Sequence, residues 1–204
     1  MNATKVKICG LTSVADAALA AALGADYLGV IFADSPRRVD VARARGIRSV
    51  VPSSALVGVF KDQPLDEVVD AALVCELDMV QLHGAETPAY CDEVLHRAGK
   101  PVVKAFRAAR IPGADVLASF RTTSYFLFDL DDDAAHRELA WDAVANTRGL
   151  GFRLFVAGGI DAGNVRAIVA RTHAFAVDVC RGVERKPGVK DPHALERFMA
   201  EVRA

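Results

Sequence analysis

Residues 55–83 read ALVGVFKDQPLDEVVDAALVCELDMVQLH, and this stretch contains a strand, a helix and a second strand. The runs 55–60 and 79–83 are apolar and have the length of strands. Pro64 stands where a helix begins, and an amphipathic run follows it. Strands that alternate with helices in this way predict a parallel sheet that is covered by helices.

The same alternation runs through the whole chain. We predict eight strands, at residues 5–9, 26–32, 55–60, 79–83, 102–106, 125–129, 153–157 and 175–178. We predict helices at residues 12–23, 40–49, 64–74, 87–99, 114–120, 141–146, 164–171 and 192–202. Gly24 and Gly99 stand at two of the helix ends, where glycine is common because it accepts a left-handed backbone.

Eight such units predict one closed (β/α)8 barrel, a small TIM barrel, with residues 1–204 as a single α/β domain. The alternative architecture is a doubly wound open sheet. Such sheets have about five or six strands, so two of the predicted strands would have to be wrong. No linker rich in Pro, Gly or Ser and no block of charge divides the chain.

The composition excludes several other classes of protein. The 204 residues are 52% hydrophobic and 25% charged, unlike those of a disordered chain. The formal net charge of −1 shows no sign of a nucleic-acid or membrane partner. The four cysteines form no CxxC pair, and we find no signal sequence and no apolar span of about 20 residues. We therefore expect a cytoplasmic protein.

In barrels of this class, the chemistry lies at the carboxyl ends of the strands. Gly158 and Gly159 follow the seventh predicted strand, and Gly182 follows the eighth. Loops at these two positions often hold a phosphate with backbone N–H groups, and glycine lets the backbone come close to the anion. The alternative is that these glycines only form turns.

Two strand ends offer a base and an acid. Cys9 ends the first strand, where a thiolate would act as general base or nucleophile, although a free cysteine is more often an inert core residue. Asp129 ends the sixth strand and is a candidate general acid, or alternatively a capping or solvated loop residue. We expect Cys75, Cys91 and Cys180 to be packing residues.

Four further side chains, at strand ends or in the loops after them, are expected to contact a substrate: Arg37, Gln81, His83 and Asp178. The alternative is a solvated loop residue for Arg37 and a capping or solvated residue for Asp178. An arginine in the segment after the second strand suits a carboxylate or phosphate, which its guanidinium binds with two parallel hydrogen bonds. A metal site needs about four ligands. His83 is the one histidine at a predicted strand end, so we expect no metal.

Short motifs in a fixed order indicate a resemblance. They are KICGLT at 7–12, SPR at 35–37, VQLHG at 80–84, AGG at 157–159 and GVE at 182–184. With them the chain resembles the phosphoribosylanthranilate isomerases of tryptophan biosynthesis over nearly its full length. The resemblance implies a cofactor-independent Amadori rearrangement, in which the aminoaldose N-(5'-phosphoribosyl)anthranilate becomes 1-(2-carboxyphenylamino)-1-deoxyribulose 5-phosphate.

The resemblance also implies roles for individual residues. Asp129 would be the general acid that opens the ribose ring to a Schiff base. Cys9 would be the general base that removes the C2′ proton, and the resulting enolamine would tautomerise to the ketone. Arg37 would hold the anthranilate carboxylate, while the two glycine loops would hold the phosphate.

Two segments depart from the family pattern. The family has Gly-Gly-Thr-Gly in a flexible loop soon after the sixth strand, whereas residues 129–138 contain no glycine. Instead, Asp131, Asp132 and Asp133 stand near the expected phosphate, where like charges repel. After the eighth strand the family has Ser-Ser-Gly-Val-Glu, whereas residues 180–184 read CRGVE. Arg181 would either add a phosphate contact or fill the pocket.

Three functions follow as alternatives. The first is the isomerase with a divergent loop, and the second is a relative that acts on a different phosphorylated or anionic substrate. The third is a catalytically silent barrel that binds a ligand or protein, but a binding module would need neither Cys9 nor Asp129. As partners we expect a small phosphorylated substrate, no nucleic acid and no membrane, and the chain as a monomer or homodimer.

Overall fold

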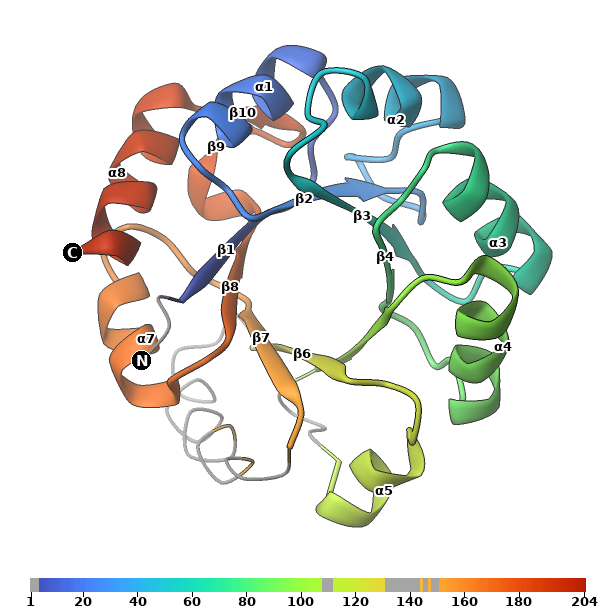
Figure 1. Ribbon diagram of the computed structural model, residues 1–204. Coiled ribbons are helices and arrows are strands. Elements are labelled where there is room, and N and C mark those ends of the chain that lie inside the picture. Colours follow the sequence, from blue (N-terminus) through green and yellow to red (C-terminus); the bar gives the residue numbers. More distant parts are fainter. Residues whose placement is uncertain (1–3, 108–111, 131–143, 145–146, 148–150) are drawn as a thin grey trace.

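A computed structural model describes residues 4–107, 112–130, 144, 147 and 151–204. Within them, eight parallel strands close into a barrel in the order β1 to β8, with β8 paired to β1 (Figure 1). The strands are β1 (Lys5–Ile8), β2 (Tyr27–Ile31), β3 (Ala55–Phe60), β4 (Met79–Leu82), β5 (Val102–Arg107), β6 (Tyr125–Asp129), β7 (Arg153–Ala157) and β8 (Ala176–Val179). The predicted barrel is confirmed, and each predicted strand end lies within one residue of the observed end.

Helices form a ring around the strands (Figure 1). They are α1 (Val14–Ala22), α2 (Val41–Arg48), α3 (Leu65–Val74), α4 (Pro88–Ala98), α5 (Ala114–Ser119), α7 (Val165–Thr172) and α8 (Pro192–Arg203). Of the helix predicted at 141–146, only Val144 belongs to the described residues, and the aspartates at 131–133 lie outside them. No helix in the described part of the chain is long and apolar enough to cross a membrane.

Side chains and glycines set the helix ends as the sequence predicts. Ser13 accepts the backbone N–H of Asp16 at 3.0 Å, which satisfies a donor that the first turn of α1 leaves free. Thr87 caps α4 in the same way. Gly24 and Gly99 follow α1 and α4 with φ of 85° and 65°, in the left-handed region that favours glycine.

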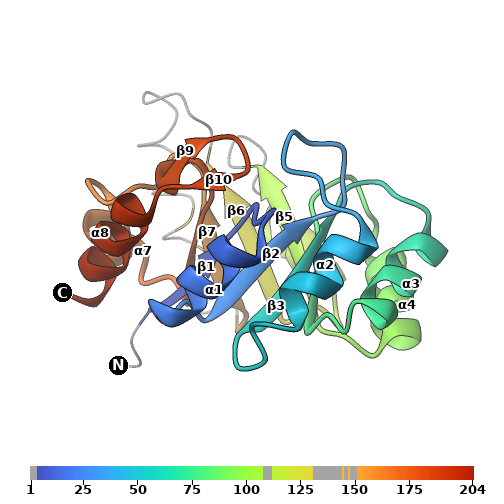
Figure 2. The same cartoon turned by 90° about the horizontal axis from the view of Figure 1, so that it is seen from above.

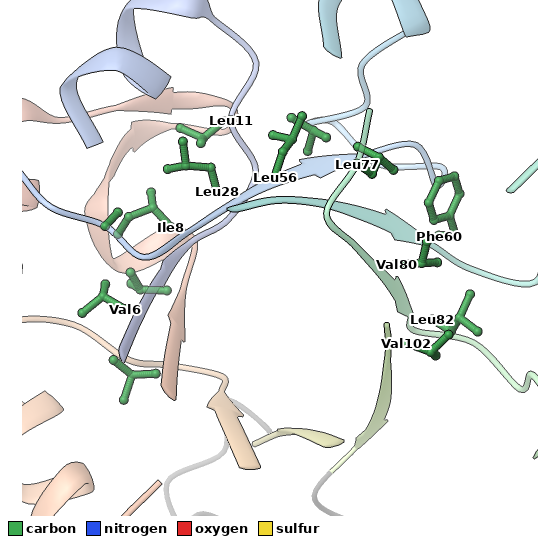
Figure 3. Packing of buried hydrophobic residues seen from close by; sticks show 14 of the residues in the cluster. Val6, Ile8, Leu11, Leu28, Leu56, Phe60, Leu77, Val80, Leu82 and Val102 are labelled. Atoms are coloured by element: carbon green, nitrogen blue, oxygen red, sulfur yellow. The ribbon is translucent and has the colours of Figure 1, made fainter. Parts of the chain in front are cut away.

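Side chains alternate along the strands between two apolar layers. Outward-facing side chains, such as those of Ile8, Leu28 and Val80, belong to the layer between strands and helices (Figure 3). A second cluster fills the barrel, and it consists of Val57, Met79, Val103, Ala105, Leu127, Phe155, Ala157 and Ala176. Tyr27, Tyr125 and Phe175 pack on this cluster at the amino-terminal ends of the strands.

The segment that follows β8 was not predicted. A short 3₁₀ helix, η2 (Arg181–Val183), leads into an antiparallel hairpin of β9 (Glu184–Lys186) and β10 (Val189–Lys190). The hairpin lies at the end of the barrel where the strands finish (Figure 2). The Thr12 hydroxyl donates to the Gly188 carbonyl, and the Lys190 N–H donates to the Asp16 carboxylate, so the hairpin is joined to the start of α1.

Candidate active site

A cavity of about 420 Å³ opens at the carboxyl ends of the strands. All ten site residues predicted from the sequence line it: Cys9, Arg37, Gln81, His83, Asp129, Gly158, Gly159, Asp178, Arg181 and Gly182. They lie at the ends of six different strands or in the loops after them, so only the closed barrel brings them together.

Cys9 lies just beyond β1 and is buried next to a second thiol, that of Cys180. Two glycines leave room for this pair. A Cβ on Gly10 would stand 2.8 Å from the Cys180 sulfur, and a Cβ on Gly29 would stand 2.8 Å from the Cys9 sulfur. Such distances are below ordinary van der Waals contact, so a larger residue at either position would displace a thiol.

Lys7 precedes Cys9 by two residues on β1, so both side chains face the barrel interior. Its Nζ lies 2.8 Å from Asp178 Oδ2, and the two side chains are only 1% and 6% exposed. Burial raises the pKa of the Asp178 carboxyl to about 7, although the Lys7 charge opposes this. For Lys7, burial is outweighed by the charges of Asp178 and Cys9, so its pKa lies above the usual value and the ammonium stays charged.

A second charged network joins Arg37, Glu184 and Lys190. The Glu184 carboxylate accepts from Arg37 Nη2 at 2.7 Å, from Arg37 Nε at 2.9 Å and from Lys190 Nζ at 3.1 Å. Burial alone would raise the pKa of Glu184, but Arg37 and Lys190 lower it, so the carboxylate is ionised. Arg37 is therefore already engaged through two of its nitrogens, and Nη1 is the nitrogen that remains for a substrate carboxylate.

These networks surround Cys9 with net positive charge. Together they hold three cations against two carboxylates, which leaves one positive charge unbalanced beside the sulfur. A hydrogen bond from Cys180 and the charges of Lys7 and Lys190 hold the pKa of the Cys9 thiol well below its usual value, although burial opposes them. A thiolate is the form of cysteine that accepts a proton, so the surroundings of Cys9 suit a base.

Asp129 ends β6, and its side chain is 35% exposed. His83 Nε2 lies 3.3 Å from Asp129 Oδ2, and His83 Nδ1 lies 3.2 Å from Gln81 Nε2. If the amide Nε2 of Gln81 donates to His83 Nδ1, the His83 Nε2–H group donates to Asp129 Oδ2. Among the described residues, no three His, Cys, Asp or Glu side chains are grouped as metal ligands would be.

Two buried acceptor atoms in the cavity have no hydrogen-bond partner among the described residues. They are Gln81 Oε1 and Asp178 Oδ1. A buried polar atom without a partner carries an unfavourable free energy, which a bound molecule relieves if it donates a hydrogen bond. Since both atoms accept hydrogen bonds, they match the hydroxyl groups of a sugar.

The two glycine loops pack directly on their neighbours. Gly158 has a φ of 93°, and a Cβ there would overlap the Leu130 carbonyl oxygen. A Cβ on Gly182 would overlap the Ile160 carbonyl oxygen, which belongs to the loop after β7. Both positions therefore require glycine, and the loops after β7 and β8 lie against each other.

Asn164 holds the loop after β7 in shape. Its Nδ2 donates to the Gly159 carbonyl at 2.8 Å, and its Oδ1 accepts the Asp161 N–H at 2.9 Å. The exposed Arg181 side chain lies on the other loop and lines the same cavity. This part of the mouth thus combines backbone held in a fixed shape with a cation, as an anion site requires.

Four members of the thiol pair and the two charged networks were not predicted. The expectation that Cys180 is a packing residue is wrong, since it lines the cavity, whereas Cys75 and Cys91 are buried as expected. The period of two along a strand is a signal for Cys180, two residues after Asp178, and for Lys7, two residues before Cys9. Local sequence holds no such signal for the other two residues, Glu184 and Lys190, because the unpredicted hairpin carries them back to the mouth.

Comparison with known proteins agrees with this geometry. The family of N-(5'phosphoribosyl)anthranilate (PRA) isomerase matches residues 6–201. The N-(5'-phosphoribosyl)anthranilate isomerase of Citrifermentans bemidjiense is 43% identical over 206 residues, which cover 98% of this chain and 97% of the relative. The enzyme of the same name from Geobacter sulfurreducens is 40% identical over 200 residues, which cover 96% of each chain.

Solved structures give the same result. The phosphoribosyl anthranilate isomerase of Thermotoga maritima has a TM-score of 0.87 and 29% sequence identity, with 98% of each chain covered. A phosphoribosyl anthranilate isomerase in complex with reduced 1-(o-carboxyphenylamino)-1-deoxyribulose 5-phosphate has a TM-score of 0.84 and 30% identity, again with 98% of each chain covered. The chain therefore belongs to the N-(5'-phosphoribosyl)anthranilate isomerase family.

Proposed function

We propose that Cys9 and Asp129 are the general base and the general acid of the reaction that this chain catalyses. The reaction is the isomerisation of N-(5'-phosphoribosyl)anthranilate in tryptophan biosynthesis, an intramolecular aldose–ketose conversion. The observation that carries the proposal is the unbalanced positive charge around the Cys9 sulfur, in the same cavity as the Asp129 carboxyl. The relatives reported above are named as this isomerase, which favours it over the two alternatives, a different substrate and a silent barrel.

Asp129 acts first in this proposal. Its protonated carboxyl gives a proton to the ribose ring oxygen, the bond between that oxygen and C1′ breaks, and the nitrogen lone pair forms the C1′=N bond of a Schiff base. His83, 3.3 Å away, orients the carboxyl. Because the Asp129 side chain is about one-third exposed, water can return the proton after each turnover.

Cys9 acts second. Its thiolate takes the proton from C2′, and the electrons of that C–H bond form the C1′=C2′ bond of an enolamine, which tautomerises to the ketone. The Schiff base makes this proton acidic because its nitrogen receives the electrons. The charges of Lys7, on β1, and of Lys190, on β10, favour the thiolate form of Cys9, and neither lysine lines the cavity.

The remaining residues bind and orient the substrate in this proposal. The phosphate lies against the loops that carry Gly158, Gly159, Arg181 and Gly182. Arg37 Nη1 binds the anthranilate carboxylate. Gln81 Oε1 and Asp178 Oδ1, the two unpartnered acceptors, bind ribose hydroxyl groups and gain the partners that they lack.

The test is turnover of freshly prepared phosphoribosylanthranilate, followed by the loss of its anthranilate fluorescence. We expect kcat to fall by roughly 10²–10⁴ in both Cys9→Ala and Asp129→Asn. The matched controls are Cys91→Ala, a buried cysteine outside the cavity, and Asp115→Asn, an exposed carboxylate on α5. Full activity in a folded Cys9→Ala or Asp129→Asn protein would remove that residue from its proposed role.

We also propose that residues 1–204 form one domain in the cytoplasm, and that the chain is a monomer or homodimer. A relative from Thermotoga maritima is described as a dimeric phosphoribosylanthranilate isomerase. Light scattering after gel filtration distinguishes a particle of 21.8 kDa from one of twice that mass.

Coincident thermal transitions in near- and far-ultraviolet circular dichroism would support the single domain, whereas two separate transitions would contradict it.

A further inference from the structure

We propose that Cys9 and Cys180 are a modification site, which hydroperoxides oxidise to a reversible disulfide at the mouth of the barrel. This proposal rests on the proposed function in one respect only: if Cys9 is the general base, its oxidation to a disulfide should stop turnover. The formation of the bond itself can be measured without any assay of activity.

The strand register places the two cysteines side by side. β1 and β8 pair with Ile8 opposite Val179, and the Cys9 N–H donates to the Val179 carbonyl at 2.8 Å. The residues that directly follow Ile8 and Val179 are Cys9 and Cys180. Neighbouring strands lie about 4.8 Å apart, which falls within the Cα separation of roughly 4.4–6.8 Å that disulfides span.

Further contacts hold the pair in this position. The Cys180 thiol donates to Glu184 Oε1 at 3.8 Å, and it lies close enough to the Cys9 sulfur to lower the pKa of that thiol. The fully buried Lys190 Nζ donates to the carbonyl oxygens of both cysteines, at 2.5 Å and 3.2 Å. Gly10, without a Cβ, leaves the space that the Cys180 sulfur occupies.

The two thiols also differ in their ionisation, which decides which of them attacks the peroxide. The pKa of the Cys9 thiol is lowered by the Cys180 hydrogen bond and by Lys7 and Lys190, so Cys9 is the attacking thiolate. The hydrogen bond to Cys9 and burial raise the pKa of Cys180, which therefore keeps its proton. Both residues line the open cavity, so a molecule as small as hydrogen peroxide reaches them.

The chemistry balances in two steps with hydrogen peroxide. The Cys9 thiolate attacks one peroxide oxygen, an S–O bond forms, the O–O bond breaks, and the released hydroxide takes a proton, which leaves Cys9 as a sulfenic acid. Once Cys9 is an uncharged sulfenic acid, the negative charge that kept the proton on Cys180 is gone, and the Cys180 sulfur attacks the Cys9 sulfur as its thiol gives up the proton. The S–O bond breaks, the Cys180 proton leaves with the hydroxyl group as water, and the disulfide forms. Two thiols are oxidised while one peroxide is reduced to two waters.

The other two cysteines lack these features and serve as internal controls. Cys75 and Cys91 are fully buried in the layer between strands and helices, and neither lines the cavity. Burial raises the pKa of both thiols, that of Cys91 to about 11. We therefore expect both to stay reduced in the folded protein while the cavity pair reacts.

The experiment treats the reduced full-length protein with a small excess of hydrogen peroxide, blocks free thiols with N-ethylmaleimide, and maps peptides by mass spectrometry. We expect the loss of two free thiols and a peptide pair that joins Cys9 to Cys180. Turnover should fall in parallel and return after dithiothreitol. In Cys180→Ser the joined peptides should be absent, and dimedone should trap a sulfenic acid on Cys9.

Two results overturn the proposal. One is a peroxide-treated wild type without the joined peptides. The other is inactivation that dithiothreitol does not reverse and that proceeds equally in wild type and Cys180→Ser, each normalised to its own untreated rate. If the joined peptides form but the reduced protein shows no turnover, the proposed roles in catalysis fail while the modification site stands.

Discussion

Lys7 links the two buried groups beneath the cavity, the Asp178 carboxyl and the Cys9 sulfur. In Lys7→Met the cation is lost, so the pKa of the Cys9 thiol should rise. A general base must be deprotonated to work, and the acidic limb of the plot of kcat/KM against pH should therefore move to higher pH, by about one unit or more. The same shift should appear when the thiolate is titrated by its ultraviolet absorbance.

The double variant Lys7→Met/Asp178→Asn separates ionisation from folding. Loss of one partner from a buried ion pair lowers the free energy of unfolding by roughly 3–5 kcal/mol when the other charge is left behind. In the double variant neither charge remains, so much of the lost free energy of unfolding should be recovered. The acidic limb of the plot of kcat/KM against pH should stay at the higher pH, because the Lys7 cation is still absent. An unshifted limb in both variants would contradict a role for Lys7 in the ionisation of Cys9.

Gly158 is expected to tolerate no side chain. In Gly158→Ala, a φ of 93° costs about 1–2 kcal/mol for a residue with a Cβ, and the overlap with the Leu130 carbonyl adds about 1–3 kcal/mol. The loop after β7 must then move, so the KM for the phosphorylated substrate should rise as well. Chemical denaturation and steady-state kinetics measure the two effects.

Gly99→Ala is the matched control for this substitution. Gly99 has a φ of 65°, and a Cβ there would meet nothing within 4 Å. We expect the free energy of unfolding to fall only by the cost of the left-handed backbone, about 1–2 kcal/mol, and the KM to stay unchanged. Equal losses of stability and equal KM values in the two variants would show that the contact with Leu130 does not matter.

At the scale of elements, one buried lysine joins the β9–β10 hairpin to the mouth of the barrel. Lys190 is fully buried, and its ammonium joins Glu184 of the hairpin to the backbone at Cys9 and Cys180. In Lys190→Met the carbonyl oxygens of Cys9 and Cys180 lose their donor while Glu184 keeps Arg37, so the free energy of unfolding should fall by roughly 1–3 kcal/mol. Amide hydrogen exchange should quicken in the hairpin before it does in the barrel strands.

Lys186→Met is the control for Lys190→Met. It tests whether the loss of stability requires removal of the buried Lys190 ammonium or follows from removal of any lysine in the hairpin. Lys186 lies on β9 with an exposed side chain. Exposed substitutions of this kind change the free energy of unfolding by about 0.5 kcal/mol or less. A loss at Lys186 as large as that at Lys190 would contradict the assignment of the stability to the buried ammonium.

At the scale of the whole molecule, the two ends of the barrel differ in composition and in their expected roles. Aromatic rings from β2, β6 and β7 close the amino-terminal end, where Phe155 lies with its ring centroid 5.2 Å from that of Tyr27 and 6.2 Å from that of Tyr125. The polar residues and the cavity lie at the carboxyl end. The expectation for such barrels is that the first end supports stability and the second end carries chemistry.

Phe155→Ala tests this division. The side chain is almost fully buried in the barrel interior, so its removal should lower the free energy of unfolding by roughly 3–5 kcal/mol. Because Phe155 does not line the cavity, the KM of the folded variant should stay close to that of the wild type. A large change in KM, measured well below the transition temperature, would show that the two ends are coupled.

Much of this protein is determined by the sequence alone, because the signals are local. Strand period, helix caps such as Ser13, and glycines such as Gly99 each act within a few residues, so the order of elements and their ends can be predicted. Once eight units predict a barrel, the carboxyl end of each strand becomes a candidate site position. Cys9 and Asp129 were found in this way, and the barrel places both in one cavity.

What surrounds those residues depends on the tertiary structure. Lys7 pairs with Asp178, Arg37 with Glu184, and Lys190 with the backbone at Cys9, across 171, 147 and 181 positions of sequence. No local pattern encodes such pairs, because they arise where β8 closes onto β1 and where the hairpin folds back over the mouth. The sequence determines which residues carry reactive groups, whereas the ionisation of those groups depends on burial and on charges that only the closed barrel brings within a few ångströms.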